Sequence, residues 1–304
     1  MGRYFGKSKN LNVMITTTTQ SKFSLAIAFM TIMICFAANS VITRYLVLGN
    51  YVPPFILTVI RFVSGLVMLQ IITSLMPRTF QKNGVKSFHI LGAFFLGIYA
   101  FSISYGYAFI SAAAGVLIFY TFVVITMTSL SVIKEKEKLT PRLIIGQLLG
   151  ILGVLIITFS GIQSVTLFGA FLMAATGVSW GLYSWHGRKF ANPFSYTYNS
   201  FLIFGAIALT LFFIGYFSSG KSLWENISLG NFGLALCLGM ISTALSYVLW
   251  HRVIKKIKTF QGGMVQLIVP VLAASMGILF LKEEVTSALI TGGMLVLVGI
   301  FLNT

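Results

Sequence analysis

One charged residue of this sequence lies in the middle of a long apolar stretch. Arg61 has mostly hydrophobic residues on both sides. A charge at mid-membrane costs about 2.5–3.5 kcal/mol on insertion scales, so such a residue faces a bundle interior or a wet cavity. Arg61 could therefore hold the carboxylate of a solute. Alternatively, it bonds helix carbonyls and the Asn39 side chain and locks two helices together; the sequence leaves both interpretations open.

The acidic residues are few, and none falls within an apolar stretch. An exporter of organic cations usually needs a buried carboxylate to bind the cation and to exchange it for protons. The lack of one favours neutral, zwitterionic or anionic solutes, with an organic-cation exporter as the alternative. The five acidic residues lie in connections or at segment ends: Glu135, Glu137, Glu225, Glu283 and Glu284.

The three histidines, His89, His186 and His251, lie at the ends of apolar segments. We expect solvated or capping roles for them rather than a proton relay. An intramembrane protease needs a paired nucleophile and base, and a metal-dependent transferase needs clustered Asp, Glu or His. Neither pattern is present, so the sequence predicts neither an enzyme nor a metal or other cofactor. A non-transporting receptor is not excluded by the residues.

Aromatic and polar residues of the apolar segments form a candidate solute site. Flat aromatic walls with a few fixed polar groups suit amphipathic metabolites, although many membrane aromatics simply sit at the interfaces. Pro270 removes a backbone hydrogen bond inside its segment and is a candidate hinge. The candidate substrate-binding residues are Asn39, Arg61, Tyr99, Tyr120, Ser179, Trp180, Tyr183, Tyr247 and Gln266.

Membrane-spanning helices must position these residues. Hydrophobic residues make up 57% of the chain and charged residues only 9%, whereas soluble domains are about 25% charged. A span takes about 20 apolar residues, so the 304 residues accommodate about ten helices. The alternation of barrel strands is missing. The expected spans are 24–45, 55–76, 89–110, 112–133, 142–161, 167–187, 195–217, 230–251, 260–281 and 286–303.

The basic residues alternate between the two sides of these spans. Seventeen of the 21 fall on one side and three on the other. The positive-inside rule therefore puts both termini on the cytoplasmic side, with 1–23 as a cytoplasmic segment. The expected membrane is a bacterial inner or plasma-type membrane. The first apolar run is too long for a secretory signal. The net charge of +16 is thus a topology signal and predicts no nucleic-acid partner.

The two halves of the chain share landmarks. Residues 36–44 match 180–188 at one constant offset, and Lys-Glu connections precede the fifth and tenth spans. A unit with an odd number of spans must insert its second copy upside down. The sequence therefore predicts an all-α integral membrane fold of ten transmembrane helices, arranged as two inverted five-helix repeats, 24–161 and 167–304. Such repeats hold a solute near the midplane.

The copies also differ, which predicts a lopsided solute path. Phe36 corresponds to Trp180, Asn39 to Tyr183, and Phe122 to Pro270. Glycines in the fifth and tenth spans share one spacing and let helices approach closely. We expect these glycines to be packing positions, with the two spans as a candidate homodimer surface: Gly146, Gly153, Gly292 and Gly299.

The sequence resembles the drug/metabolite transporter superfamily, in particular its EamA-type members, over about residues 24–303. The resemblance is carried by 179–184, 246–250 and 266–270 with the Lys-Glu-Glu that follows, and by Asn39 and Arg61. It implies ten helices with cytoplasmic ends, a central cavity, and transport of amino acids, related metabolites or drugs, often as export. Residues 180–184 are similar to members that export aromatic amino acids.

Two positions depart from the pattern of that family. Phe122 stands where the fourth span usually carries proline, which argues against a symmetric pair of kinks. Val269 stands where an acidic residue often precedes the proline of the ninth span, so a charged contact is lost. The sequence has neither a ring of like charges nor a repeated filter motif, the features that would indicate a channel. The sequence thus predicts an alternating-access carrier, an exporter or facilitator of small solutes in the lipid bilayer.

Overall fold

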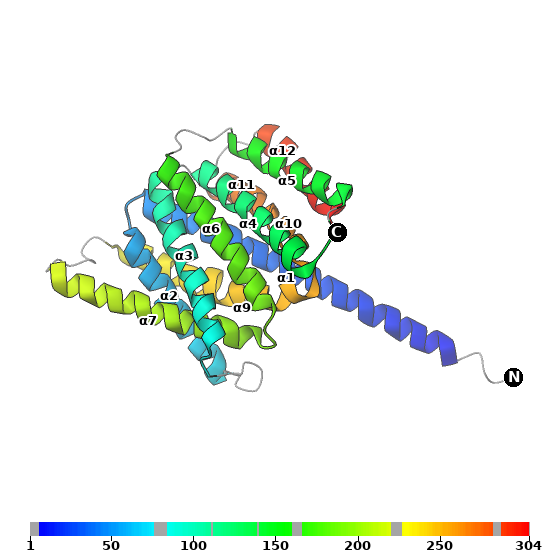
Figure 1. Ribbon diagram of the computed structural model, residues 1–304, viewed down its shortest axis with the longest axis horizontal. Coiled ribbons are helices and arrows are strands. Elements are labelled where there is room, and N and C mark those ends of the chain that lie inside the picture. The colour runs from blue at the N-terminus through cyan, green and yellow to red at the C-terminus, as the bar shows by residue number, and fades with distance from the viewer. Residues whose placement is uncertain are drawn as a thin grey trace.

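The computed structural model describes residues 6–75, 84–110, 112–138, 140–159, 166–219, 227–281 and 287–303. Apart from the connections, these residues are helical (Figure 1). A π-helical segment, Leu238–Leu245, and a short 3-10 helix, Ile254–Lys256, accompany the α-helices. The α-helices are α1 (Gly6–Leu48), α2 (Pro54–Leu75), α3 (Ser87–Phe109), α4 (Ala112–Glu135), α5 (Pro141–Phe159), α6 (Leu167–Arg188), α7 (Pro193–Ser219), α8 (Leu229–Cys237), α9 (Ser246–Val253), α10 (Thr259–Val265), α11 (Ile268–Leu281) and α12 (Ser287–Leu302).

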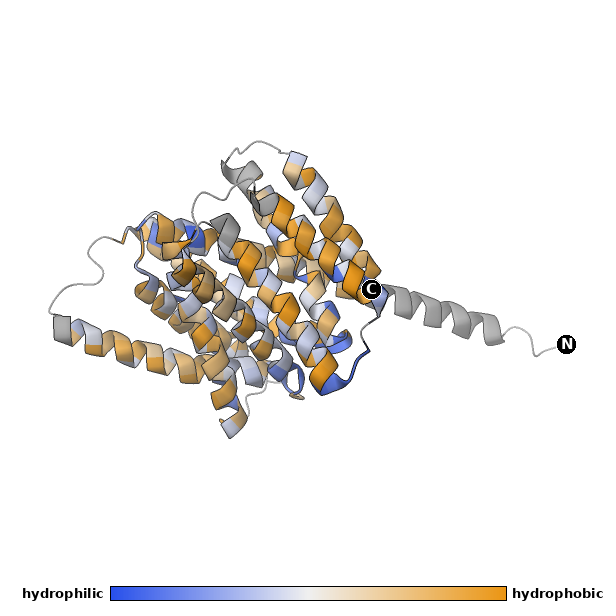
Figure 2. Cartoon of the chain, turned by 45° about the horizontal axis from the view of Figure 1, so that its top comes forward, coloured by the Kyte–Doolittle hydropathy of each residue, from blue (hydrophilic) through white to orange (hydrophobic). Residues whose placement is uncertain are grey.

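Within the described part of the chain, eight helical stretches are long and apolar enough to cross a membrane. One of them, Leu229–Lys256, contains α8, the π-helical segment and α9, and another, Thr259–Met276, joins α10 to α11. Shorter apolar stretches occupy α5 and α12. Hydrophobic residues run along the helices while hydrophilic residues gather at their ends (Figure 2). The chain is therefore a multi-pass, helical membrane protein; length and composition establish eight spans among its described residues and do not confirm the expected ten.

The helices begin where the local sequence favours a start. Pro54, Pro141 and Pro193 are first residues of α2, α5 and α7, a position where the missing N–H of proline has no cost. Thr166 and Ser228 cap α6 and α8. Each side-chain hydroxyl accepts a hydrogen bond from the backbone N–H of the third residue of its helix, at 3.1 and 3.2 Å. The expected span edges agree with the observed helix ends to within a few residues, except that α1 begins at Gly6 rather than at residue 24, so residues 6–23 continue the first helix.

The eighth expected span is not one regular helix. The π-helical segment Leu238–Leu245 lies between α8 and α9, and such segments interrupt the regular hydrogen-bond pattern of a helix. The Ser242 carbonyl inside it accepts hydrogen bonds from Asn39 Nδ2 at 3.3 Å and from Ser246 Oγ at 2.6 Å. The irregular segment thus supplies a polar contact between the two halves of the chain.

The ninth expected span breaks into α10 and α11 at residues 266 and 267. Pro270 has no N–H to donate to the Gln266 carbonyl. That carbonyl instead accepts from the Val269 N–H at 3.0 Å, one residue early. The corresponding helix of the first half, α4, carries Phe122 in place of Pro270 and is continuous. The two halves therefore differ in backbone at this point, because only one of them has the proline.

Glycines bring α5 and α12 into close contact within one chain (Figure 1). A Cβ on Gly153 would lie 2.4 Å from the Gly292 carbonyl oxygen, and one on Gly299 would lie 2.5 Å from the Gly146 carbonyl oxygen. The expected packing role of these glycines is therefore present. Since early residues of α5 meet late residues of α12, the two helices run antiparallel.

Two ion pairs connect the halves at one end of the bundle. Arg188 Nη1 donates to Glu135 Oε1 at 2.9 Å, and Lys258 Nζ donates to Glu137 Oε2 at 2.8 Å. Thr259 Oγ1 also donates to Glu135 Oε1, at 2.7 Å. These contacts tie the end of α4 to the end of α6 and to the start of α10.

Four connections rich in basic residues meet at this end, which we call the basic end. It comprises residues 84–88, 134–138, 188–192 and 252–258. Besides the ion pairs, Lys255 Nζ donates to the Phe190 carbonyl at 2.7 Å, and the Phe190 ring stacks on Phe88 with centroids 4.0 Å apart. The sequence assigned these four connections to the same side of the membrane.

Candidate functional site

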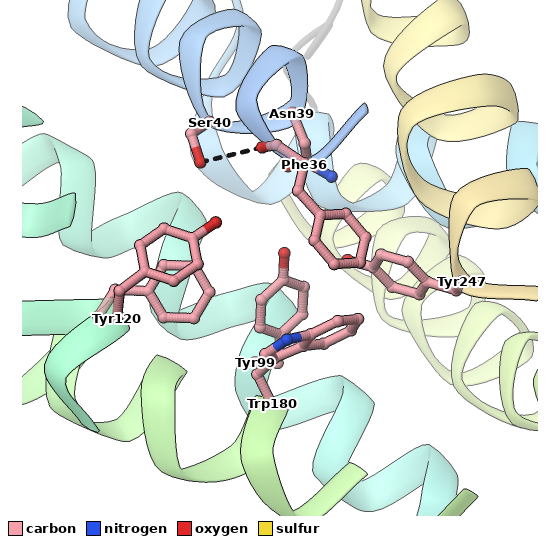
Figure 3. Close-up of a pocket in the computed structure, with 8 residues that line it drawn as sticks. Phe36, Asn39, Ser40, Tyr99, Tyr120, Trp180 and Tyr247 are labelled. Carbon is pink, nitrogen blue, oxygen red and sulfur yellow. Dashed lines mark hydrogen bonds between the residues drawn. The ribbon is translucent and has the colours of Figure 1, made fainter. Parts of the chain in front are cut away.

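A small cavity lies between α1, α3, α4, α6 and α9 (Figure 3). It has room for about one water molecule, so a solute of amino-acid size could enter only after the helices move. Its lining is mostly aromatic, with an amide and hydroxyl groups as the polar part. The lining residues are Phe36, Asn39, Ser40, Tyr99, Phe119, Tyr120, Trp180 and Tyr247.

Trp180 is the centre of the aromatic wall. Its ring centroid lies 4.6 Å from that of Tyr247, 5.2 Å from that of Tyr99 and 5.3 Å from that of Phe36. Tilted and T-shaped aromatic pairs at such distances each add about 0.5–1.5 kcal/mol beyond the area they bury. The rings lie beside one another in Figure 3, which gives a stiff wall for a flat apolar group.

Corresponding residues of the two halves meet at this cavity. Phe36 corresponds to Trp180, and Tyr99 corresponds to Tyr247 at the same offset that relates Phe122 to Pro270. The Tyr99 and Tyr247 ring centroids are 6.2 Å apart. Equivalent residues of two copies touch only near the axis that relates the copies. The cavity therefore lies at the junction between the halves.

Asn39 makes the polar contact across this junction. Its Nδ2 donates to Thr243 Oγ1 at 3.1 Å, in addition to the Ser242 carbonyl, and its Oδ1 accepts from Thr43 Oγ1 at 3.5 Å. Both ends of the amide are thus engaged. Ser40 Oγ donates to the Phe36 carbonyl at 3.3 Å in its own helix (Figure 3).

Arg61 is completely buried but does not line the cavity. Its Nη2 donates to Thr43 Oγ1, which links α2 to α1, while its Nε and Nη1 have no hydrogen-bond partner among the described residues. Thr43 Oγ1 in turn donates to Asn39 Oδ1 at 3.5 Å, which connects Arg61 to the cavity lining. The expected lock between the first two spans is therefore made through Thr43 rather than Asn39, and two guanidinium nitrogens are left for an anion.

Gln266 supports the cavity from behind. Trp180 Nε1 donates to Gln266 Oε1 at 2.7 Å, and Gln266 Nε2 donates to the Gly262 carbonyl at 2.8 Å. Because both ends of this buried amide are engaged, Gln266 fixes the plane of the indole. It lies at the break between α10 and α11, so that break and the aromatic wall are mechanically connected.

Two further candidates also lie outside the lining. Ser179 Oγ donates to the Ala175 carbonyl at 2.5 Å, within its own helix. Tyr183 packs between Trp180 and Tyr196, with ring centroids 5.8 and 5.3 Å apart. Tyr183 therefore extends the aromatic wall from the cavity towards the basic end.

The sequence-based candidates divide into two groups. Those in the cavity lining are Asn39, Tyr99, Tyr120, Trp180 and Tyr247, and those outside it are Arg61, Ser179, Tyr183 and Gln266. Sequence reasoning missed Phe36, Ser40 and Phe119. The repeat contained a signal for Phe36, because it corresponds to Trp180. Ser40 and Phe119 adjoin the candidates Asn39 and Tyr120.

The histidines are buried rather than solvated. The exposed fractions of His89, His186 and His251 are 2%, 9% and 0%. His89 does cap α3, since its Nδ1 accepts from the Lys86 N–H at 2.9 Å. Solvated or capping roles are wrong for His186 and His251, because the Tyr196 ring packs against both.

The acidic residues that the structure describes, Glu135 and Glu137, both lie at the basic end in ion pairs. Glu225, Glu283 and Glu284 lie outside the described residues. Within the described lining of the cavity there is no carboxylate. The nearby fixed charge is the guanidinium of Arg61.

Comparison with known proteins gives one family and several relatives. The model of the EamA-like transporter family matches residues 23–159 and again 167–304. The chain is 32% identical over 277 residues to the uncharacterized protein PA1977 of Pseudomonas aeruginosa, covering 89% of this chain and 91% of the relative. It is 27% identical over 264 residues to the uncharacterized transporter YoaV of Bacillus subtilis, covering 83% and 88%. A protein of known crystal structure shares the fold, with a TM-score of 0.75 at 18% identity over 92% of this chain and 96% of that one.

Proposed function

The chain belongs to the EamA-like transporter family, and on this premise we propose that it carries small neutral, zwitterionic or anionic metabolites, such as amino acids, across a membrane. The observation that carries the proposal is Arg61. Its guanidinium is fully buried, has two nitrogens without a partner among the described residues, and is connected through Thr43 to Asn39 of the cavity lining. A carboxylate is the natural bidentate partner of such a group.

The aromatic wall suits the rest of such a solute. Trp180, Tyr99 and Tyr247 offer flat apolar faces around the Asn39 amide, which matches an amphipathic metabolite that has one polar end. An aromatic amino acid fits this description well. Cations also bind aromatic faces, but no described carboxylate offsets the charge of Arg61 here.

The small size of the cavity supports an alternating-access mechanism. Room for about one water molecule cannot hold a metabolite, so binding requires the halves to separate on one side at a time. We place the hinge at the break before Pro270, because Gln266 connects that break to Trp180. Net flux in this proposal is export or facilitated diffusion.

The proposed topology is ten spans in two inverted repeats, 24–161 and 167–304. The antiparallel contact of α5 with α12 supports it, as does the meeting of Phe36 with Trp180. The basic end is the cytoplasmic side, which puts both termini there. A homodimer through α5 and α12 would use their outer faces, where Leu148 and Met294 are exposed, because the glycines face inwards.

The test is uptake into liposomes of a panel of labelled amino acids, organic acids and organic cations. Arg61→Ala should lower uptake of a zwitterion or anion by at least about tenfold, since hydrogen bonds to charged groups contribute about 1.5–3 kcal/mol. Arg44→Ala is the matched control, because Arg44 is an exposed arginine on α1, and it should transport normally. Uptake of cations alone would refute the proposal. A misfolded Arg61→Ala protein with a folded, active Arg61→Lys would assign Arg61 to the helix lock instead.

A further inference from the structure

A column of aromatic rings separates the cavity from the basic end. From Trp180 in the cavity wall, it continues through Tyr183 and Tyr196 to Phe190 in the connection that follows α6. The successive centroid distances are 5.8, 5.3 and 5.1 Å. Phe190 in turn stacks on Phe88. A solute could pass between the cavity and the basic end on this side only if the column opened.

The three histidines of the chain surround this column. The centroid of Tyr196 lies 5.1 Å from His251, 5.5 Å from His186 and 6.4 Å from His89. We call these residues the histidine cluster. They come from three helices, α9, α6 and α3, while Tyr196 comes from α7. Four helices therefore meet at titratable rings.

Polar contacts hold the cluster in its closed arrangement. His186 Nδ1 and the Tyr196 hydroxyl are hydrogen-bonded at 3.0 Å, and His251 Nδ1 and Thr197 Oγ1 are hydrogen-bonded at 3.2 Å. His251 Nε2 is buried and has no hydrogen-bond partner among the described residues. It lies against Gly187, where a Cβ would be 2.4 Å from it. The closed column thus contains a nitrogen that can take up a proton.

The charged groups that face the cluster are cations. The positive charge of Lys86 opposes protonation of His89, that of Lys189 opposes protonation of His186, and that of Lys255 opposes protonation of His251. The histidines also act on one another. The other titratable neighbours are the phenols of Tyr183 and Tyr196, and the backbones of Tyr183 and Tyr247 both contact His251. Within the described chain, the carboxylate that reaches this region is Glu135, which acts on Lys189 and is paired with Arg188.

We propose that the histidine cluster is a proton-binding site and that proton binding opens the column towards the basic end. A charged imidazolium inside the closed column would meet cations, while the described carboxylate of this region, Glu135, is already paired with Arg188. In the open column, water would solvate it. Protons therefore bind better to the open state, and a ligand that prefers one state shifts the population to that state.

This inference rests on the proposed function, because it names what controls the gate of that carrier. It gives the carrier a sensor for protons without a membrane carboxylate. An imidazolium at His186 can only donate through Nδ1, so a hydrogen bond that the neutral ring accepts there from the Tyr196 hydroxyl would be lost on protonation. One proton linked to opening changes the ratio of open to closed protein by up to about tenfold per pH unit.

The first experiment measures access to the cavity from the basic end. Ser40→Cys places a thiol in the cavity lining, in a background in which Cys35 and Cys237 are replaced by serine. An impermeant maleimide is applied to liposomes from the side on which Lys138→Cys reacts, because Lys138 is exposed at the basic end. Each rate is divided by that of Lys138→Cys, which removes the intrinsic pH dependence of the thiol.

The corrected rate should rise several-fold to about tenfold between about pH 7.5 and about pH 5.5. His186→Gln and His251→Gln should flatten this rise while leaving the elution profile and melting temperature of the protein close to normal. A rate that does not change with pH, or a rise that persists in both variants, would overturn the proposal.

The second experiment counts the protons directly. Since the chain contains 3 histidines and all belong to the cluster, ¹⁵N-histidine labelling of untagged protein in liposomes reports on this site alone. The imidazolium signal should grow over the pH range in which the thiol becomes accessible. Histidines that stay neutral throughout would refute proton binding even if a variant misfolded. Neither readout needs a solute, so failure of the transport assay and failure of this inference are distinguishable.

Discussion

The contact between α4 and α6 gives a sharp test of the packing around the cavity. A Cβ on Gly177 of α6 would lie 2.4 Å from the Phe119 carbonyl oxygen and 2.6 Å from the Phe122 Cβ. Phe119 lines the cavity. Because a backbone carbonyl cannot turn aside as a flexible side chain can, Gly177→Ala must push the two helices apart.

The expected magnitude follows from these distances. Ordinary contact begins near 3.4 Å, so the helices must separate by about 1 Å. Overpacking of this kind costs about 1–3 kcal/mol, and the higher helix propensity of alanine offsets up to about 1 kcal/mol of it. We expect Gly177→Ala to lower the free energy of unfolding by about 1–2 kcal/mol. Transport should also fall, because the Phe119 side of the cavity moves.

The assay is thermal and SDS-induced unfolding in one detergent, with Gly205→Ala as the matched control. Gly205 is a buried glycine of α7 whose Cβ would be 3.8 Å from the closest atom, the Phe62 carbonyl oxygen. Alanine fits there, so this variant should be neutral or up to about 1 kcal/mol more stable. Equal stability of the two variants would refute the reasoning, since the substitution is the same and only the space differs.

Two further predictions concern polar contacts. Gln266→Leu leaves the buried Trp180 N–H without its acceptor at 2.7 Å, which should cost about 1–3 kcal/mol in SDS unfolding. The double variant Gln266→Leu/Trp180→Phe should lose less stability than the sum of the losses in the two single variants, because both substitutions remove the same hydrogen bond. Losses that add fully would contradict this coupling. Glu135→Gln should lower the melting temperature more than Glu137→Gln, because Glu135 bonds both Arg188 and a threonine hydroxyl. Each partly exposed pair contributes about 0.2–1 kcal/mol, so the loss in each variant should shrink in high salt; losses that salt does not change would argue against an ionic origin.

Several features of the fold could be predicted because they depend on local composition. Apolar length gave the approximate positions of the eight stretches that can cross a membrane, and prolines at 54, 141 and 193 marked helix starts. The break at residue 266 was predictable in kind, since Pro270 cannot donate a hydrogen bond. Its position was not, because the Val269 N–H and the Gln266 carbonyl close a shorter turn.

The π-helical segment gave no sequence signal. Leu238–Leu245 is an ordinary apolar stretch by composition. Its irregular backbone is held by contacts that arise only when Asn39, about two hundred residues away in the chain, reaches the Ser242 carbonyl. Burial of His186 and His251 was missed for the same reason. Their coverage by Tyr196 depends on how α7 packs across the ends of two other helices.

The amino-acid sequence was sufficient to predict a membrane protein of two related halves, with aromatic residues and Asn39 between them. Hydropathy and repeat spacing are sufficient for this prediction, because a helix must be apolar over the thickness of the bilayer to cross it, and repeated landmarks imply repeated structure. Which of the candidates reach the cavity depends on how the helices pack in the tertiary structure. Gln266 and Trp180 are 86 residues apart, and whether a side chain lines a wall or supports it depends on distances of a few ångströms between helices. Such distances are set by packing, as at Gly177 and Phe119, and no single segment encodes them.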